Sequence, residues 1–301
     1  MSKKIAVIGA VNMDICGKSN GTIIPFDSNL GKVSLSFGGV ARNIAENLRK
    51  LNVDVSFLTA FGNDLFGREI QDHCLEIGID LSLSQNFDYP TSTYLFVADE
   101  NGEMQVAIND MTIYKKITTD IIATNLAEIN SCDYVVLDTN FEKEVIEYIC
   151  HNVTSPIVID AVSIAKSKKL IDVLNKIDYL KPNKIEAEFL SNTKIVDEKS
   201  LRKSADTLLG LGVKNVLITL GEHGVYFANA TTKQLVPAIK TAVVNSTGAG
   251  DSFVGGFVYG LANDYDVVTA VKLGVAASSI TLQSNETVSP HMCEETLLKK
   301  I

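Results

Sequence analysis

A glycine-rich segment that leads into an aspartate has the clearest chemical potential in this sequence. It reads N-S-T-G-A-G-D-S-F-V-G-G-F over residues 245–257, and the apolar spacing after Asp251 predicts a helix. Backbone N–H groups at a helix start can bind an anion, and the small residues Gly248, Ala249 and Gly250 allow a phosphate to approach them closely. Asp251 could accept the proton of an attacking hydroxyl, as phosphoryl transfer requires. A helix cap beside a tight turn is the alternative, and this segment alone does not decide between them.

Other common patterns of nucleotide and metal chemistry are absent from the sequence. No G-x-x-x-x-G-K-[ST] segment occurs, and no G-x-G-x-x-G follows the first expected strand, which argues against a P-loop and a dinucleotide site. The five cysteines are widely spaced without a C-x-x-C pair, which argues against a disulfide framework and a zinc site. We therefore expect the phosphate site at residues 248–251.

Alternating apolar runs and amphipathic stretches must form the scaffold that positions this turn. Continuous apolar runs, typical of parallel strands buried on both faces, occur at residues 4–10, 55–60, 134–138, 157–160, 177–180 and 216–220. Stretches with helical periodicity lie between many of them, such as residues 40–51 and 66–77. This alternation predicts an α/β fold with a doubly wound, mostly parallel sheet flanked by helices. The chain is expected to end in helices.

Two segments interrupt the alternation and predict a small inserted β-lid. Residues 17–37 are polar and rich in turn formers, and two runs with period-2 alternation flank Asn101-Gly102, which is a hairpin signal. We expect a lid formed by about residues 17–37 and 91–112, covering the carboxyl ends of the sheet. No repeat or Pro/Ser-rich linker occurs, so residues 1–301 are predicted to be a single domain.

Composition and charge exclude several classes of partner. The net charge is -9, with a sequence pI near 5.0 and no run of lysine and arginine, so neither nucleic acid nor an anionic membrane is an expected partner. The short apolar run at the start ends in Asn12 and Asp14, unlike a signal peptide, and no segment reaches the length of a membrane helix. We therefore expect a cytoplasmic protein.

Several ordered motifs resemble the ribokinase-like (PfkB) family of carbohydrate and nucleoside kinases. G-A-G-D at 248–251 is similar to that family's C-terminal signature, and residues 38–67 to its N-terminal signature. The resemblance extends to Asn12 and Asp14, to N-x-x-E at 183–186 and to the segment 219–224. Together these motifs cover nearly the whole chain.

The resemblance implies an ATP- and Mg²⁺-dependent kinase with assigned residues. It implies Asp251 as the catalytic base, with Gly248, Ala249 and Gly250 as the anion hole. It implies that Asp14, Gly39 and Asn43 hold the ribose hydroxyls, with Asn12 and Gly38 also in the substrate site. Asn183 and Glu186 would act near the magnesium-bound phosphates, Glu186 through a water, and the nucleotide site would be lined by Thr219, Gly221 and Gly224.

Within that family, three segments are similar to the pseudouridine kinase subfamily. They are residues 27–33, 38–48 and 102–111. Asp27, Asn29 and Asn109 place polar groups in or beside the lid, where a uracil edge needs both donors and acceptors. Turn formation is the alternative for Asp27 and Asn29. Asn140 and Lys166 also resemble the subfamily's pattern and are candidate substrate contacts.

Three positions depart from the family pattern. Leu30 stands where the subfamily usually has proline, and Ala41 where glycine is frequent. Asn245 stands where most members carry an aspartate that helps bind a monovalent cation. Because an amide oxygen is a weaker ligand than a carboxylate, dependence on a monovalent cation stays open.

The resemblance implies phosphoryl transfer from ATP to the 5'-hydroxyl of pseudouridine. The alternatives are a kinase for another ribose-like substrate (ribose, a purine nucleoside or a hexose) and a non-catalytic nucleoside-binding protein. A nicotinamide-dependent oxidoreductase shares the sheet class but lacks the glycine fingerprint. An exposed lid edge could also pair two copies, so we expect a homodimer through the lid.

Overall fold

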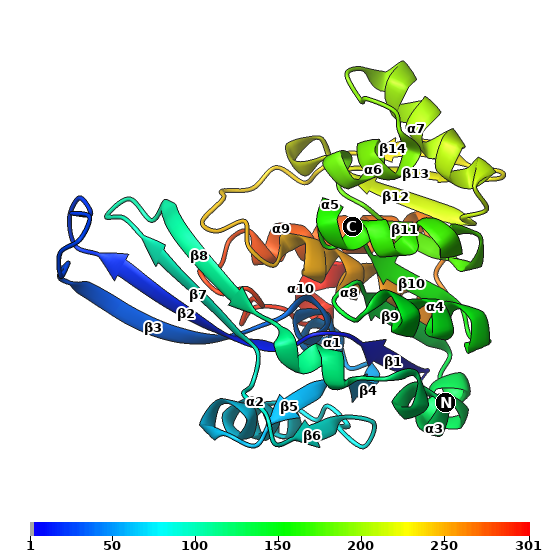
Figure 1. Cartoon of the computed structure of the whole chain (residues 1–301). Coiled ribbons are helices and arrows are strands. Elements are labelled where there is room, and N and C mark those ends of the chain that lie inside the picture. Colours follow the sequence, from blue (N-terminus) through cyan, green and yellow to red (C-terminus); the bar gives the residue numbers. More distant parts are fainter. Residues whose placement is uncertain (1–2) are drawn as a thin grey trace.

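The apolar runs of the sequence form a central sheet in the computed structural model, which describes residues 3–301 (Figure 1). The strand order is β14-β13-β12-β11-β10-β9-β1-β4. In chain order the strands are β1 (Lys4–Ile8), β4 (Asp54–Leu58), β9 (Tyr134–Asp138), β10 (Ile157–Asp160), β11 (Tyr179–Lys181), β12 (Asn215–Thr219), β13 (Val225–Asn229) and β14 (Lys233–Val236). The strands from β4 to β12 run parallel, which confirms the predicted fold class. The antiparallel hairpin β13–β14 at the edge was not predicted.

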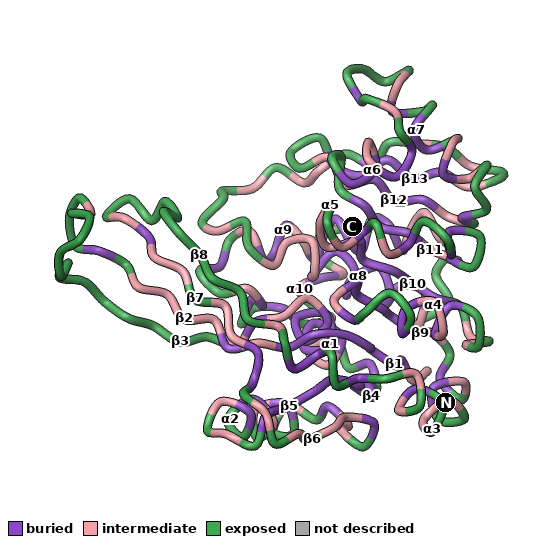
Figure 2. The backbone as a smooth tube through the Cα atoms, viewed as in Figure 1, coloured by how far each residue is buried: buried purple, intermediate pink, exposed green. Residues whose placement is uncertain are grey.

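Helices cover both faces of this sheet because successive strand side chains point to opposite sides. Ala6 and Ile8 of β1 pack in one hydrophobic core, and Ile5 and Val7 in the other. The first core is covered by α3 (Thr119–Ser131), α4 (Lys143–Asn152), the 3-10 helix η2 (Lys168–Lys176), α6 (Lys184–Ser191) and α7 (Glu198–Gly210). The second is covered by α1 (Val40–Lys50), α2 (Leu65–Glu76), α8 (Ala249–Ala262), α9 (Val267–Thr281) and α10 (Glu294–Leu298). Figure 2 shows the buried backbone concentrated in these layers.

Polar side chains fix where several helices begin. Asp64 accepts a hydrogen bond from the Gly67 amide at the start of α2, and Asp266 caps α9 in the same way. Helix α8 differs, because it begins at Gly248 without any side-chain cap. The Ala249 amide donates to the Ser246 carbonyl oxygen, while in the described part of the chain the next two amides, of Gly250 and Asp251, are left for another partner.

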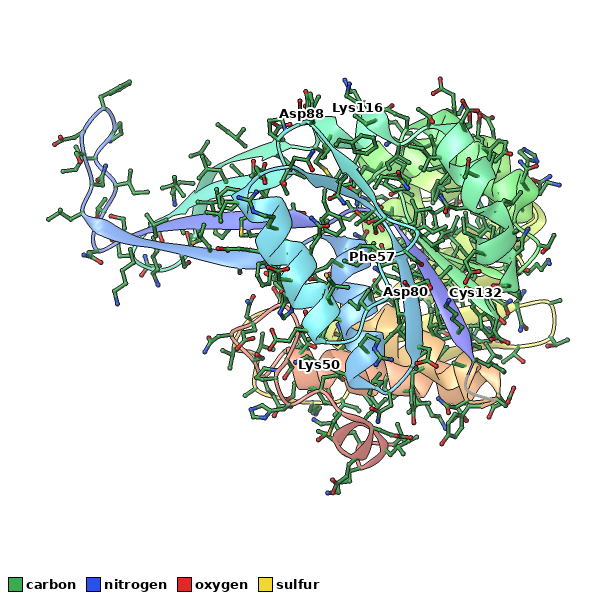
Figure 3. The ribbon with its side chains drawn as sticks, turned by 90° about the horizontal axis from the view of Figure 1, so that it is seen from below. Lys50, Phe57, Asp80, Asp88, Lys116 and Cys132 are labelled. Carbon is green, nitrogen blue, oxygen red and sulfur yellow. The ribbon has the colours of Figure 1, made fainter. Side chains whose placement is uncertain are left out.

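A four-stranded small sheet extends away from the central body (Figures 1 and 3). Its order is β3-β2-β7-β8, from β2 (Asn12–Ser19), β3 (Gly31–Gly38), β7 (Thr93–Ala98) and β8 (Met104–Asp110). The segments 17–37 and 91–112 contribute to it, but β2 already begins at Asn12 and β3 is a full strand. The sequence did not predict β2 and β3 as full strands, because the segment is rich in turn formers. The two strands form by pairing with each other and, for β2, with β7.

The shorter elements connect these layers. They are β5 (Ala60–Gly62), β6 (Gln85–Phe87), α5 (Ile164–Ser167) and the 3-10 helices η1 (Thr112–Lys116) and η3 (Gly221–His223). β5 and β6 pair into a two-stranded sheet. Among residues 3–301, no helix has both the length and the apolar character needed to span a membrane.

Candidate functional site

The expected site residues follow the carboxyl ends of adjacent parallel strands. Asn12 follows β1, Asn140 follows β9 and Lys166 follows β10, while Asn183 follows β11 and Thr219 ends β12. Neighbouring parallel strands end at the same edge, so residues far apart in the chain meet there. A cavity of about 200 Å³ at this edge is lined by Asn12, Asp14, Gly39, Asn43, Asn109, Asn140, Lys166 and Asp251, among others.

The start of α8 presents backbone amides to this region. Gly248 has φ 81°, and a Cβ there would collide with the backbone carbonyl of Thr287, so only glycine fits without strain. Within residues 3–301, the amides of Gly250 and Asp251 have no hydrogen-bond partner. The turn is therefore suited to bind an anion.

Asp251 lines the same 200 Å³ cavity and directly follows the glycine-rich turn. Burial, followed by the negative charge of Asp160, raises the pKa of Asp251 to about 7, although Asn43 and Lys181 oppose this shift. The Asn43 amide donates a hydrogen bond to Asp251 Oδ2 at 2.7 Å. A carboxylate with a pKa near neutrality can act as a general base near pH 7.

The opposite wall of the cavity offers groups that bind hydroxyls. The Asn12 amide donates a hydrogen bond to Asp14, and burial raises the pKa of Asp14 to about 6 against the positive charge of Arg42. A Cβ on Gly38 would strike the Asp14 carboxyl group, and Gly39 has φ 100°. Small residues are thus required beside this carboxylate.

Asn140 and Lys166 form the third side of the cavity. The Lys166 ammonium donates a hydrogen bond to Asn140 Oδ1. The Asn140 backbone amide donates to Asp138 at 2.9 Å, which anchors the turn after β9. Burial lowers the pKa of Lys166, while the charge of Asp138 opposes this shift. Asn109 reaches the same cavity from β8.

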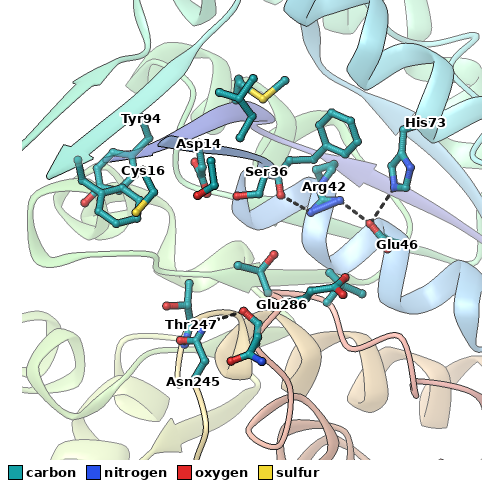
Figure 4. A pocket seen from close by; sticks show the side chains of 18 of the residues that line it. Asp14, Cys16, Ser36, Arg42, Glu46, His73, Tyr94, Asn245, Thr247 and Glu286 are labelled. Carbon is teal, nitrogen blue, oxygen red and sulfur yellow. Dashed lines mark hydrogen bonds and ion pairs between the residues drawn. The ribbon is translucent and has the colours of Figure 1, made fainter. Parts of the chain in front are cut away.

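A larger cavity of about 950 Å³ adjoins the first one beneath the small sheet (Figure 4). Its wall includes Arg42, Glu46 and His73, which the sequence interpretation missed. Arg42 forms a buried ion pair with Glu46 and donates to Asn43 Oδ1 at 2.6 Å, while His73 Nε2 lies 3.3 Å from Glu46. The signal in the sequence was an arginine and a glutamate four residues apart within the expected helix at residues 40–51.

A third cavity, of about 450 Å³, lies on the other side of the α8 start. Thr219, Gly221 and Gly224 line it together with Ala249 and Gly250. The rest of its wall includes the apolar side chains of Val225, Ile239, Phe253, Val275 and Leu282. Its apolar wall suits a planar base, and its contact with the turn suits attached phosphates.

Asn183 and Glu186 hold each other in a capping box at the start of α6. Asn183 Oδ1 accepts from the Glu186 amide at 2.9 Å, and Glu186 accepts from the Asn183 amide at 2.7 Å. Glu186 is buried, which raises its pKa, while Lys181 opposes this shift. Among residues 3–301, no group of three or more histidine, cysteine or acidic residues is placed to bind a metal directly. The buried carboxylate of Glu186, held in place by Asn183, could contact a hydrated magnesium ion through water.

Three residues that the sequence analysis singled out lie outside the 200 Å³ cavity. Asp27 and Asn29 are exposed in the loop between β2 and β3 and line none of the three cavities; Asn29 Oδ1 accepts from the Ile24 amide at 2.8 Å. Asp27 and Asn29 therefore fit the alternative interpretation as turn residues, because their side chains form hydrogen bonds with backbone groups of the loop. Asn245 donates to the Asn285 carbonyl oxygen at 3.1 Å and borders the large cavity.

Comparison with known proteins shows the family to which the chain belongs. The model of the pfkB family of carbohydrate kinases matches residues 2–292. The chain is 34% identical to the pseudouridine kinase of Escherichia coli (strain K12), covering 96% of this chain and 93% of that protein. It is 28% identical to the ribokinase of Staphylococcus aureus (strain COL), covering 95% of each. The ribokinase structure from Thermotoga maritima superposes with a TM-score of 0.89 at 24% identity, covering 99% of this chain and 98% of that one.

Proposed function

Because this chain belongs to the pfkB family of carbohydrate kinases and is an ATP-dependent kinase, we propose that it phosphorylates the 5'-hydroxyl of pseudouridine. One observation carries the choice of acceptor. The cavity beside Asp251 combines groups that bind hydroxyls with two amides and an ammonium, Asn109, Asn140 and Lys166. A plain sugar needs only the first set. The similarity to the pseudouridine kinase of Escherichia coli supports the same acceptor.

The ribose half of the acceptor is assigned to Asn12, Asp14, Gly39 and Asn43. Asp14 can accept hydrogen bonds from two neighbouring hydroxyls, and Gly39 lets the sugar lie against the backbone. Asn43 accepts from Arg42 through its oxygen, so its NH₂ group is the one that faces Asp251. In this pose the 5'-hydroxyl lies at Asp251, which takes its proton during transfer.

The base half is assigned to Asn109, Asn140 and Lys166. A uracil joined to ribose through carbon retains two N–H donors beside its two carbonyl acceptors. Side-chain amides supply both donors and acceptors, and an ammonium supplies donors only. The three side chains therefore suit a base edge that carries both kinds of group.

The nucleotide half is assigned to the 450 Å³ cavity and the α8 turn. Thr219, Gly221 and Gly224 would border the nucleotide, and the amides of the turn would donate to the phosphates. ATP supplies the phosphoryl group, and Mg²⁺ offsets phosphate charge. Glu186 would act on the hydrated ion through water. Asn245 Oδ1 accepts a hydrogen bond from the Thr247 amide at 2.9 Å and so fixes the loop that leads into the α8 turn.

We expect turnover with pseudouridine to exceed turnover with the other acceptors strongly. ADP release from Mg-ATP should be measured with pseudouridine, uridine, adenosine, ribose and fructose side by side. Because a missing hydrogen-bond partner leaves buried polar groups unpaired, we expect kcat/KM for uridine to be lower by about 10²-fold or more. Comparable turnover with ribose or a purine nucleoside would favour the second candidate, a kinase for another ribose-like substrate.

Substitutions in the base half sharpen this test. Asn140→Ala and Lys166→Ala should each raise KM for pseudouridine while leaving KM for ATP unchanged. Leu211→Ala, at an exposed position beyond α7, serves as a control with unchanged constants. Unchanged KM for pseudouridine in either site variant would remove that residue from the acceptor site.

We further propose that two copies associate through the outer face of the small sheet. The strand register places Val33, Leu35, Leu95, Val106 and Ile108 on one face, and all five are exposed. Asp14, Tyr94 and Asn109 alternate with them on the inner face, which borders the cavities. An exposed apolar sheet face of this kind marks an association surface, and a second copy offers the same complementary face.

The oligomeric state tests this proposal. Light scattering after size exclusion should give the mass of a dimer for the wild-type chain and of a monomer for Leu35→Asp/Ile108→Asp. Val196→Asp, at another exposed apolar position outside the small sheet, should leave the dimer intact. A monomeric wild-type chain at micromolar concentration would contradict the proposal.

A further inference from the structure

A lysine that the sequence interpretation did not single out lies beneath the α8 turn. Lys181 ends β11, and its ammonium donates a hydrogen bond to Asp160 Oδ2 at 2.8 Å. The two residues are paired across neighbouring strands, and they are 7% and 2% exposed. Because buried ion pairs often add little net stability, this pair calls for another explanation.

The Lys181 ammonium lies directly against the residues assigned to phosphoryl transfer. A Cβ placed on Gly250 would come within 3.2 Å of Lys181 Nζ, so only a residue without a side chain separates the ammonium from the nucleotide cavity. Burial lowers the pKa of Lys181, but the carboxylates of Asp160, Asp251 and Glu186 outweigh this and raise it overall. The ammonium is therefore charged at neutral pH.

Donor groups remain available on this ammonium. An ammonium carries three N–H donors. Asp160 takes one of them, and no other side chain or carbonyl in the described part of the chain accepts a hydrogen bond from Lys181. The amides of Gly250 and Asp251 next to it are free as well. The Lys181 ammonium and the two free amides thus lie on one side of the turn, where they could donate hydrogen bonds to a polyphosphate.

We infer that Lys181 is a further catalytic residue, which donates to an oxygen of the transferring γ-phosphoryl group while Asp160 holds it in place. In the transfer, the acceptor oxygen forms a bond to the γ-phosphorus, and the bond from that phosphorus to the leaving oxygen of ADP breaks. The acceptor proton moves to Asp251. Lys181 breaks and forms no covalent bond, and it offsets the negative charge on the phosphoryl oxygens. This inference depends on ATP-dependent phosphoryl transfer and not on the identity of the acceptor.

Two variants separate a catalytic role from a structural one. Lys181→Met alone leaves Asp160 buried without its partner and can destabilise the fold. Lys181→Met/Asp160→Asn removes both charges and should keep a wild-type melting temperature. Lys214→Met is the lysine control, because the exposed Lys214 pairs with Asp178 at 2.6 Å next to the amino ends of β12 and β11, at the opposite edge of the sheet.

The double variant should lose about 10²- to 10³-fold in kcat with the best acceptor, the size expected for removing one such electrostatic group. Calorimetry without acceptor should show affinity for a non-hydrolysable ATP analogue with Mg²⁺ reduced by about tenfold or more, and affinity for AMP unchanged. A folded double variant with wild-type kcat and analogue affinity would overturn the inference. Failure of pseudouridine as an acceptor would leave the calorimetric result unaffected.

Discussion

Replacing Asp251 with asparagine should lower kcat by about 10²- to 10⁴-fold, the contribution typical of a general base. Asparagine keeps the shape and can still face Asn43, but it cannot take a proton from the acceptor hydroxyl. KM for ATP should change little, because the carboxylate is assigned to the proton and not to the phosphates. Steady-state ADP release with the best acceptor measures both constants. The exposed variant Asp264→Asn is the control and should retain wild-type rates.

The pH dependence gives a second measure of the same group. Since the pKa of Asp251 is raised to about 7 by burial, the acid limb of kcat/KM should have its midpoint near pH 7. The sign for stability follows from the same shift. The folded state favours the neutral form of the Asp251 carboxyl group. Its contribution to the free energy of unfolding is therefore complete below the pKa of Asp251 in the unfolded chain, and it is lost as pH rises through about 7.

Asp251→Asn should therefore be at least as stable as the wild-type chain at pH 8. Thermal unfolding at pH 5 and pH 8 tests this, and the difference between the two proteins should grow at the higher pH. A variant that loses activity together with stability at pH 8 would assign Asp251 a structural role. One that keeps activity within threefold of wild type would remove it as the base.

Replacing Gly248 with alanine should also lower kcat strongly. The positive φ at this position disfavours any side chain, and a Cβ would collide with the Thr287 carbonyl group, so the start of α8 must shift. We expect kcat to fall by about 10²- to 10³-fold, because the donors of an anion hole act only in one geometry. The strain should also lower the free energy of unfolding by about 1–3 kcal/mol.

Gly210→Ala provides the matched glycine control. This glycine ends α7, and a Cβ there would meet nothing within 4 Å. Its activity should equal that of the wild-type chain, and its stability should be unchanged or slightly higher. Chemical denaturation and steady-state kinetics on both variants would distinguish the local geometry of the α8 start from a general intolerance of alanine. A fully active Gly248→Ala variant would contradict the assigned anion hole.

Much of the architecture follows from local sequence pattern. Strands such as β1 and β9 are continuous apolar runs because they are buried on both faces, and this pattern is visible without a structure. The turn at 248–251 was also recognisable, because small residues followed by an aspartate at a helix start restrict the backbone strongly. The hairpin β13–β14 was missed, since its short strands depend on tertiary pairing, of β13 with β12 and of β14 with β13.

The sequence by itself determined the fold class and the kinase family and located the glycine-rich turn at 248–251, because these depend on local pattern and ordered motifs. Only the tertiary structure decided which polar residues share a site. Asn29 has the same side-chain amide as Asn109, yet Asp27 and Asn29 lie in an exposed loop while Asn109 lines the 200 Å³ cavity beside Asp251. Lys181 meets Gly250 and Asp160 only because neighbouring parallel strands end at one edge, a proximity that spacing along the chain does not encode.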